Sequence, residues 1–190
     1  MAEQRMTTGI PRLDEITFGG FVSDRSYLLV GAPGAGKTLF AIQWLLEGSR
    51  QGERCLYLTL AEPADEIARN AASLGWNLAG SDLVDLSPTT ATDAAIDDEY
   101  HIFPPSEVEG VPVWQRIFET VRAIRPQRMV IDSMTQLRYL STDEYQFRKH
   151  VLGLVNFLNR QHTTSILAFE PTELERETSI ALAVDGVIRG

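Results

Sequence analysis

Cysteine, long apolar runs and basic clusters are all scarce in this sequence. Its 190 residues include one cysteine, Cys55, which excludes an internal disulfide framework and is typical of a reducing compartment. No segment approaches the about 20 apolar residues that span a membrane, and the opening MAEQRM has no apolar stretch of the kind found in signal peptides. We therefore expect a cytoplasmic protein without a membrane-spanning segment.

Positive charge is in deficit as well. The chain has 17 Lys and Arg against 26 Asp and Glu, giving a net charge of −9. A surface of this sign repels phosphate backbones, so the charge disfavours general nucleic-acid binding. The histidines, His101, His150 and His162, are too scattered for a recognisable metal-binding motif.

Hydrophobic residues make up 44% of the chain, enough for the core of one globular domain, and we predict a single domain over residues 1–190. Short apolar runs alternate with helical patterns, which predicts an α/β fold with a mainly parallel central sheet flanked by helices. Strands are predicted at residues 26–30, 55–60, 83–86, 129–132, 164–169 and 184–189. Helices are predicted at 39–48, from 63 to 74, through 114–124 and from about 143 to 158. Residues 87–111 are predicted to form a long irregular loop.

Residues 31–38 read GAPGAGKT and lie between a predicted strand and a predicted helix. Glycines in such a loop let successive backbone N–H groups point inward, toward a phosphate at the helix N-terminus. Lys37 in this motif reaches the β- and γ-phosphates, and Thr38 ligates Mg²⁺. The pattern predicts a site for ATP or GTP with Mg²⁺. Its predicted binding residues are Gly31, Ala32, Pro33, Gly34, Ala35, Gly36, Lys37, Thr38 and Leu39.

Three acidic residues lie at or just after the ends of predicted strands. Asp132 ends the run RMVID, which has the form of a Walker B strand, and is predicted to hold Mg²⁺ through its water shell; the alternative is a cap on the next segment. The residues alone leave two roles open for Glu62, which either orients the attacking water or stabilises the start of the helix at Pro63. Glu170 is either a nucleotide-sensing group or part of a turn with Pro171.

The N-terminal residues carry a family resemblance. TGIPRLD at 8–14, then Gly19-Gly20 and the phosphate loop, resembles the TGIxxLDxxxxGG opening of the KaiC-like branch of the RecA superfamily of ATPases. The resemblance continues through YLTLAE at 57–62, VIDS at 130–133 and DGVI at 185–188, and so covers nearly the whole chain.

This resemblance implies a three-layer, RecA-like P-loop NTPase core that uses ATP. It also implies a homo-oligomer, commonly a hexameric ring, with ATP bound between subunits. By the same resemblance Glu62 is the catalytic glutamate that activates water, acting with Lys37.

Two departures from the family pattern matter. KaiC domains usually carry a Glu-Glu pair where this chain has Ala61-Glu62. The family also continues into a segment whose Lys and Arg reach the neighbour's γ-phosphate, whereas this sequence stops at Gly190. Such a cation contributes roughly 10³- to 10⁵-fold in rate in related NTPases. We therefore expect the C-terminal end of the family domain to be missing, and ATP binding with slow turnover.

Three functions fit these features. The first is a Mg²⁺-dependent ATPase with its site between subunits, which signals to a protein partner by a conformational change. The second is an ATP-gated assembly module with little hydrolysis, favoured by Ala61 and by the absent basic segment. The third is a recombinase-like ATPase on single-stranded DNA, opposed by the net charge and by the lack of a Gly-rich basic loop after Ser133.

Overall fold

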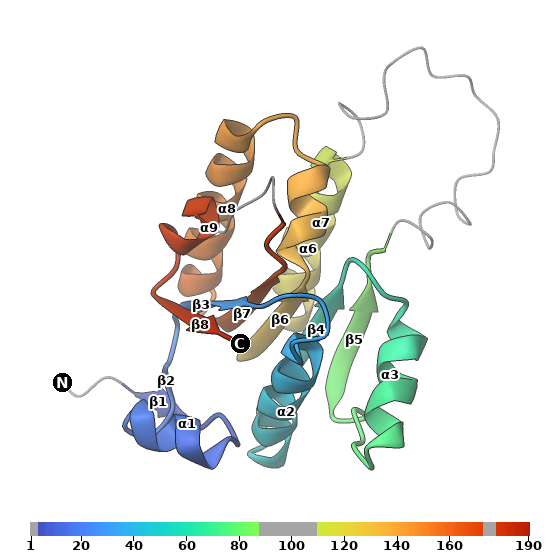
Figure 1. Cartoon of the computed structure of the whole chain (residues 1–190), viewed down its shortest axis with the longest axis vertical. Helices are drawn as coiled ribbons and strands as arrows, with labels where there is room; N and C mark the ends of the chain where they lie inside the picture. Colours follow the sequence, from blue (N-terminus) through green and yellow to red (C-terminus); the bar gives the residue numbers. More distant parts are fainter. Residues whose placement is uncertain (1–3, 88–109, 173–177) are drawn as a thin grey trace.

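The structure is a computed structural model that describes residues 4–87, 110–172 and 178–190. In these ranges six strands form one parallel sheet in the order β5-β4-β6-β7-β3-β8, with helices on both faces (Figure 1). The predicted α/β class, with a mainly parallel sheet flanked by helices, is confirmed. Most of the loop predicted at 87–111 lies outside the described residues.

Each predicted strand and helix is found; the strands at 26–30 and 164–169 have the predicted ends, and the other elements have at least one end shifted by one to four residues. The elements in chain order are β1 (Arg5–Met6), α1 (Pro11–Ile16), β2 (Phe21–Val22), β3 (Ser26–Val30), α2 (Lys37–Arg50), β4 (Cys55–Thr59), α3 (Ala64–Ser73), β5 (Ser81–Asp85), α6 (Gly110–Ile124), β6 (Arg128–Asp132), α7 (Met134–Tyr139), α8 (Glu144–Arg160), β7 (Thr164–Phe169), α9 (Thr178–Ala181) and β8 (Gly186–Arg189). Strand β5 begins before its apolar residues because Ser81 pairs with Cys55 at the start of β4. Strand β8 begins at Gly186; just before it, the Asp185 carboxylate accepts a hydrogen bond from the Ser26 N–H, and the Asp185 N–H donates to the Ser26 carbonyl oxygen, both at 2.9 Å.

Both faces of the central strands β3, β4, β6 and β7 are buried, whereas the edge strands β5 and β8 are partly exposed. Successive residues of β4 alternate between two apolar cores: Leu56 and Leu58 pack on the side of α6, α7, α8 and α9, whereas Cys55 and Tyr57 pack on the side of α2 and α3. This arrangement explains why the central strands read as unbroken apolar runs. Cys55 is a buried free thiol.

The N-terminal residues form a small unit that the strand pattern did not predict. Strands β1 and β2 pair antiparallel around α1. The backbone N–H and hydroxyl of Thr8 donate to Asp14 Oδ1 at 2.7 and 2.8 Å, which closes the turn into α1. Gly20 has φ +108°, and a Cβ there would lie 2.0 Å from the Met6 carbonyl oxygen. The TGIxxLDxxxxGG signature therefore encodes the folding of this unit.

Arg128, the first residue of β6, fastens the N-terminal unit to the core. Its fully buried guanidinium forms an ion pair with Glu53 and donates to the carbonyl oxygens of Thr7 at 2.7 Å and Trp44 at 3.0 Å. It also lies 5.2 Å from the centre of the Trp44 ring. One cation thus joins the N-terminal unit, α2 and the sheet.

Candidate functional site

The strand order brings the predicted site residues to one edge of the sheet. Strand β7 lies between β3 and β6, and β4 lies on the far side of β6. All four strands run parallel, so their carboxyl ends meet at the same edge, where ligands bind in open α/β sheets. The phosphate loop follows β3, Glu170 follows β7, Asp132 ends β6, and Glu62 follows β4.

The loop between β3 and α2 has the backbone conformation that its glycines predict. Gly34 and Gly36 have φ of +80° and +86°, and a Cβ on either would meet nothing within 4 Å, so glycine is needed there for conformation rather than for space. Gly31 is different, because its Cβ would lie 3.0 Å from the Ala35 Cβ. Residues 32–35 are exposed, and α2 begins directly after the loop. The first N–H groups of this helix are available to an anion.

Lys37 lies beneath this loop with its side chain only 5% exposed. Its ammonium donates to the carbonyl oxygens of Gly31 at 2.9 Å and Ala32 at 3.0 Å. Glu170 Oε1 lies 3.0 Å from the same nitrogen. The structure thus brings Glu170, a residue with two open interpretations, into direct contact with the lysine of the loop.

Thr38 and Asp132 are adjacent, as the Walker motifs predict. The Thr38 hydroxyl donates to Asp132 Oδ2 at 3.0 Å, and the Tyr57 hydroxyl donates to the same oxygen at 2.6 Å. A hydroxyl beside a carboxylate is a donor set that fits Mg²⁺, which keeps several waters and shares phosphate oxygens. Across the described ranges no group of three or more His, Cys, Asp or Glu side chains could hold a metal by themselves. The pair therefore fits a Mg²⁺ that is also bound by waters and by the phosphates of a nucleotide.

Tyr57 is the site residue that sequence reasoning missed. Its ring is fully buried, and burial together with the charge of Asp132 raises the pKa of the phenol well above its ordinary value. The hydroxyl therefore stays protonated and donates to Asp132. The one available signal was a tyrosine between two leucines in the strand Cys55–Thr59.

We expect Tyr57→Phe to raise the Mg²⁺ concentration needed for half-maximal ATP binding by roughly tenfold. Residues that orient a metal ligand typically affect metal affinity on this scale. A fluorescent ATP analogue titrated at increasing Mg²⁺ would measure the change, with unchanged binding at saturating Mg²⁺ as the control. An unaltered Mg²⁺ midpoint would show that the Tyr57 hydroxyl does not support the metal site.

Glu62 lies in the turn between β4 and α3. The Thr59 hydroxyl donates to its carbonyl oxygen at 2.6 Å. Partial burial and the negative charges of Asp132, Glu66 and Glu170 raise the pKa of the Glu62 carboxyl, although the residue is exposed.

The alternative role for Glu62 is to stabilise the start of α3, but other acidic side chains lie at this helix end. The first helical N–H, that of Ala64, donates to Asp85 Oδ2 at 3.2 Å. The acidic residues of the first turn are Asp65 and Glu66. Other groups thus already stabilise this helix end.

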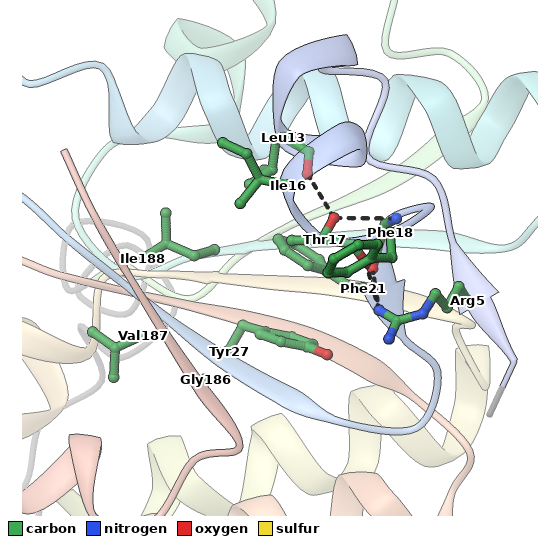
Figure 2. Close-up of a pocket in the computed structure, with 11 residues that line it drawn as sticks. Arg5, Leu13, Ile16, Thr17, Phe18, Phe21, Tyr27, Gly186, Val187 and Ile188 are labelled. Carbon is green, nitrogen blue, oxygen red and sulfur yellow. Dashed lines mark hydrogen bonds between the residues drawn. The ribbon is translucent and has the colours of Figure 1, made fainter. Parts of the chain in front are cut away.

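A groove lies on the α2 side of the sheet, between the N-terminal unit and β8, away from the phosphate loop. Figure 2 shows this groove, whose cavity volume is about 450 Å³. Phe18 and Ile16 at its rim are 85% and 74% exposed. The Arg5 guanidinium is held by the carbonyl oxygens of Thr17 and Gly20. The groove is mainly apolar, and the chemistry-bearing residues lie at the other site. Its lining residues are Arg5, Leu13, Ile16, Thr17, Phe18, Gly20, Phe21, Tyr27, Gly186, Val187 and Ile188.

The family is shown by comparison with known proteins. A family model described as "ATPase: KaiC" matches residues 6–189. The chain belongs to the KaiC ATPase family. Membership supports ATP binding by this KaiC-family chain. In the described ranges no helix has the length and apolarity needed to cross a membrane.

Individual relatives agree with this assignment. A UPF0273 protein of Aeropyrum pernix is 31% identical over 97% of this chain and 77% of its own length. The circadian clock protein KaiC3 of Synechocystis is 29% identical over 93% of this chain but only 34% of its own length, so this KaiC-family chain spans about a third of it.

A solved structure shows the same fold. The crystal structure of a KaiC-like protein from Pyrococcus horikoshii superposes with a TM-score of 0.78 at 28% identity, over 99% of this chain and 81% of the other. The predicted three-layer, RecA-like core of the KaiC branch is thereby confirmed.

Proposed function

We propose that this KaiC-family chain binds ATP with Mg²⁺ and hydrolyses it slowly at a site between subunits, and that the nucleotide state signals to a protein partner. The observation that carries the proposal is the assembly at one sheet edge of the buried Lys37 ammonium and the Thr38–Asp132 pair, 3.0 Å apart. An ammonium, a hydroxyl and a carboxylate in this arrangement are the groups that bind a Mg²⁺-triphosphate.

Each residue has a distinct role in this proposal. The N–H groups of the loop and of the first turn of α2 bind phosphate oxygens, and Lys37 contacts the β- and γ-phosphates. Thr38 and Asp132 would hold Mg²⁺, which when bound neutralises charge that develops on the phosphates. Glu62 orients the attacking water and accepts its proton; because its pKa is raised, it is a stronger base than an ordinary glutamate.

A ring of subunits, commonly six, follows from the family resemblance, and two structural features agree with a shared site. Residues 32–35 and Glu62 are exposed at the sheet edge, where a neighbouring subunit has access to them. A cation from that neighbour would add to the charge stabilisation of the phosphates.

The second candidate function is an ATP-gated assembly module with little hydrolysis. Ala61 favours it, because only one carboxylate follows strand β4 where KaiC domains usually carry two. One experiment on ATP hydrolysis separates the two candidate functions.

That experiment measures Mg²⁺-ATP hydrolysis against protein concentration, with Lys37→Ala as the blank. A site shared between subunits predicts that specific activity rises as subunits associate, and that Lys37→Ala abolishes both ATP binding and the rise. A rate at blank level despite ATP binding would favour the assembly module. Specific activity that stays constant over the association range would contradict a shared site.

A further inference from the structure

The Lys37 ammonium has no spare hydrogen-bond donor. An ammonium carries three N–H groups. Its three acceptors are the carbonyl oxygens of Gly31 at 2.9 Å and Ala32 at 3.0 Å, and Glu170 Oε1 at 3.0 Å. A phosphate oxygen that contacts this nitrogen must therefore replace one of them.

Glu170 is the acceptor that can leave. The two carbonyl oxygens belong to the backbone of the phosphate loop, and their displacement would deform the loop that also binds the phosphates. The Glu170 carboxylate is at the end of a flexible side chain that is 40% exposed, so it can rotate into water. Exposure lowers the cost of separating this ion pair.

The backbone of Glu170 stays in place while its side chain rotates. The Glu170 N–H donates to Thr135 Oγ1 at 2.9 Å, and the Thr135 hydroxyl in turn lies 3.4 Å from the Glu170 carbonyl oxygen. Thr135 is buried in α7, which packs against β7. The carboxylate therefore moves about a fixed main chain.

We propose that Glu170 is a displaceable counter-ion for Lys37, which competes with the phosphates of the nucleotide and so weakens their binding until it swings away. This inference rests on the proposed ATP site and adds a positioning residue to it. Competition arises from direct contact, and it is reinforced because a carboxylate beside Lys37 also repels the triphosphate.

The test compares Glu170→Gln with the wild type by calorimetric titration of ATP, inorganic pyrophosphate and adenosine. Glutamine keeps the size of the side chain but loses its charge. We expect ATP and pyrophosphate to bind about 5- to 10-fold more tightly, because the phosphates then displace a neutral acceptor rather than the carboxylate of an ion pair. Adenosine has no phosphate and should bind equally to both proteins.

Two further variants distinguish an effect of direct contact between Glu170 and Lys37 from an effect of net charge near the site. Glu66→Gln removes the same charge from the same edge but lies in α3, where Glu66 faces Arg69. It should change ATP affinity by less than about twofold at moderate salt, because exposed charges are screened. Glu170→Asp keeps the charge but shortens the reach, so it should also tighten pyrophosphate binding. It provides an independent test should Glu170→Gln fail to fold.

The outcomes distinguish the inference from the function on which it rests. Failure of the wild type and every Glu170 variant to bind ATP or pyrophosphate would overturn both. The counter-ion role alone would be overturned if the wild type bound ATP but neither Glu170 variant bound it more tightly. It would also be overturned if Glu66→Gln gained as much affinity as the Glu170 variants. Weaker binding by Glu170→Gln would also overturn it, because Glu170 would then support the bound phosphates.

Discussion

Glu62→Gln is expected to lower the rate of ATP hydrolysis by on the order of 10²- to 10⁴-fold, the usual contribution of a general base. Glutamine has nearly the same shape but cannot accept the proton of the attacking water. ATP binding should be retained, because Lys37, Thr38 and Asp132 are unchanged. Single-turnover hydrolysis and a binding titration on the same protein measure the two effects separately. Glu66→Gln, on the exposed face of α3, is the matched control.

The raised pKa of Glu62 gives this variant a second signature. The folded state holds the Glu62 proton more tightly than the unfolded chain does, so ionisation costs stability as pH rises through and above the ordinary range of glutamate. Glu62→Gln removes this cost, and its unfolding temperature relative to the wild type should rise slightly between about pH 4 and about pH 7. If Glu62→Gln hydrolysed ATP at the wild-type rate, the general base would have to be another residue.

Arg128→Leu is expected to lower the free energy of unfolding by about 3–5 kcal/mol, the usual effect of removing one partner from a buried ion pair. The change leaves Glu53, whose side chain is 16% exposed, without its cation, and it removes the bonds to the Thr7 and Trp44 carbonyl oxygens. Urea denaturation at constant pH measures the loss. Limited proteolysis should show earlier cleavage in the N-terminal unit, because Arg128 is the buried member of its contacts with the core, which also include hydrogen bonds with Gln43 and Glu47 of α2.

Arg69→Leu provides the comparison for Arg128. Arg69 pairs with Asp65 on the surface of α3, where the two side chains are 64% and 68% exposed. Its loss should change stability by less than roughly 1 kcal/mol. Equal effects of the two substitutions would contradict an anchoring role for Arg128.

The features that the sequence predicted are those encoded by neighbouring residues. The phosphate loop is a contiguous motif, and strands such as β4 and β7 are apolar runs whose burial on both faces fixes their composition. The carboxyl ends of such strands share an edge in any parallel sheet, so the approach of Thr38 to Asp132 was predictable before the strand order was known.

Contacts that depend on strand order were not predictable. Tyr57 reaches Asp132 because β4 pairs with β6 in the register that places Thr59 opposite Asp132. Glu170 reaches Lys37 because β7 lies next to β3. No local pattern encodes either neighbourhood.

The shortest elements were not predicted from the sequence, for a different reason. Strands β1 and β2 have two residues each, and α7 has six, which is too short for a periodic pattern to emerge. Ser133 is the residue before α7. The N-terminal unit is instead specified by single contacts such as Thr8 with Asp14.

Strand β6 joins two distant parts of the molecule end to end. Arg128 at its start is clamped to the N-terminal unit, and Asp132 at its finish lies against Thr38. Between them β6 is hydrogen-bonded on both sides, to β4 and β7. A strand held in this way resists displacement along its axis, because sliding it would break its hydrogen bonds to two neighbouring strands at once. Displacing the N-terminal unit along this strand would therefore also disturb the sheet edge at Asp132.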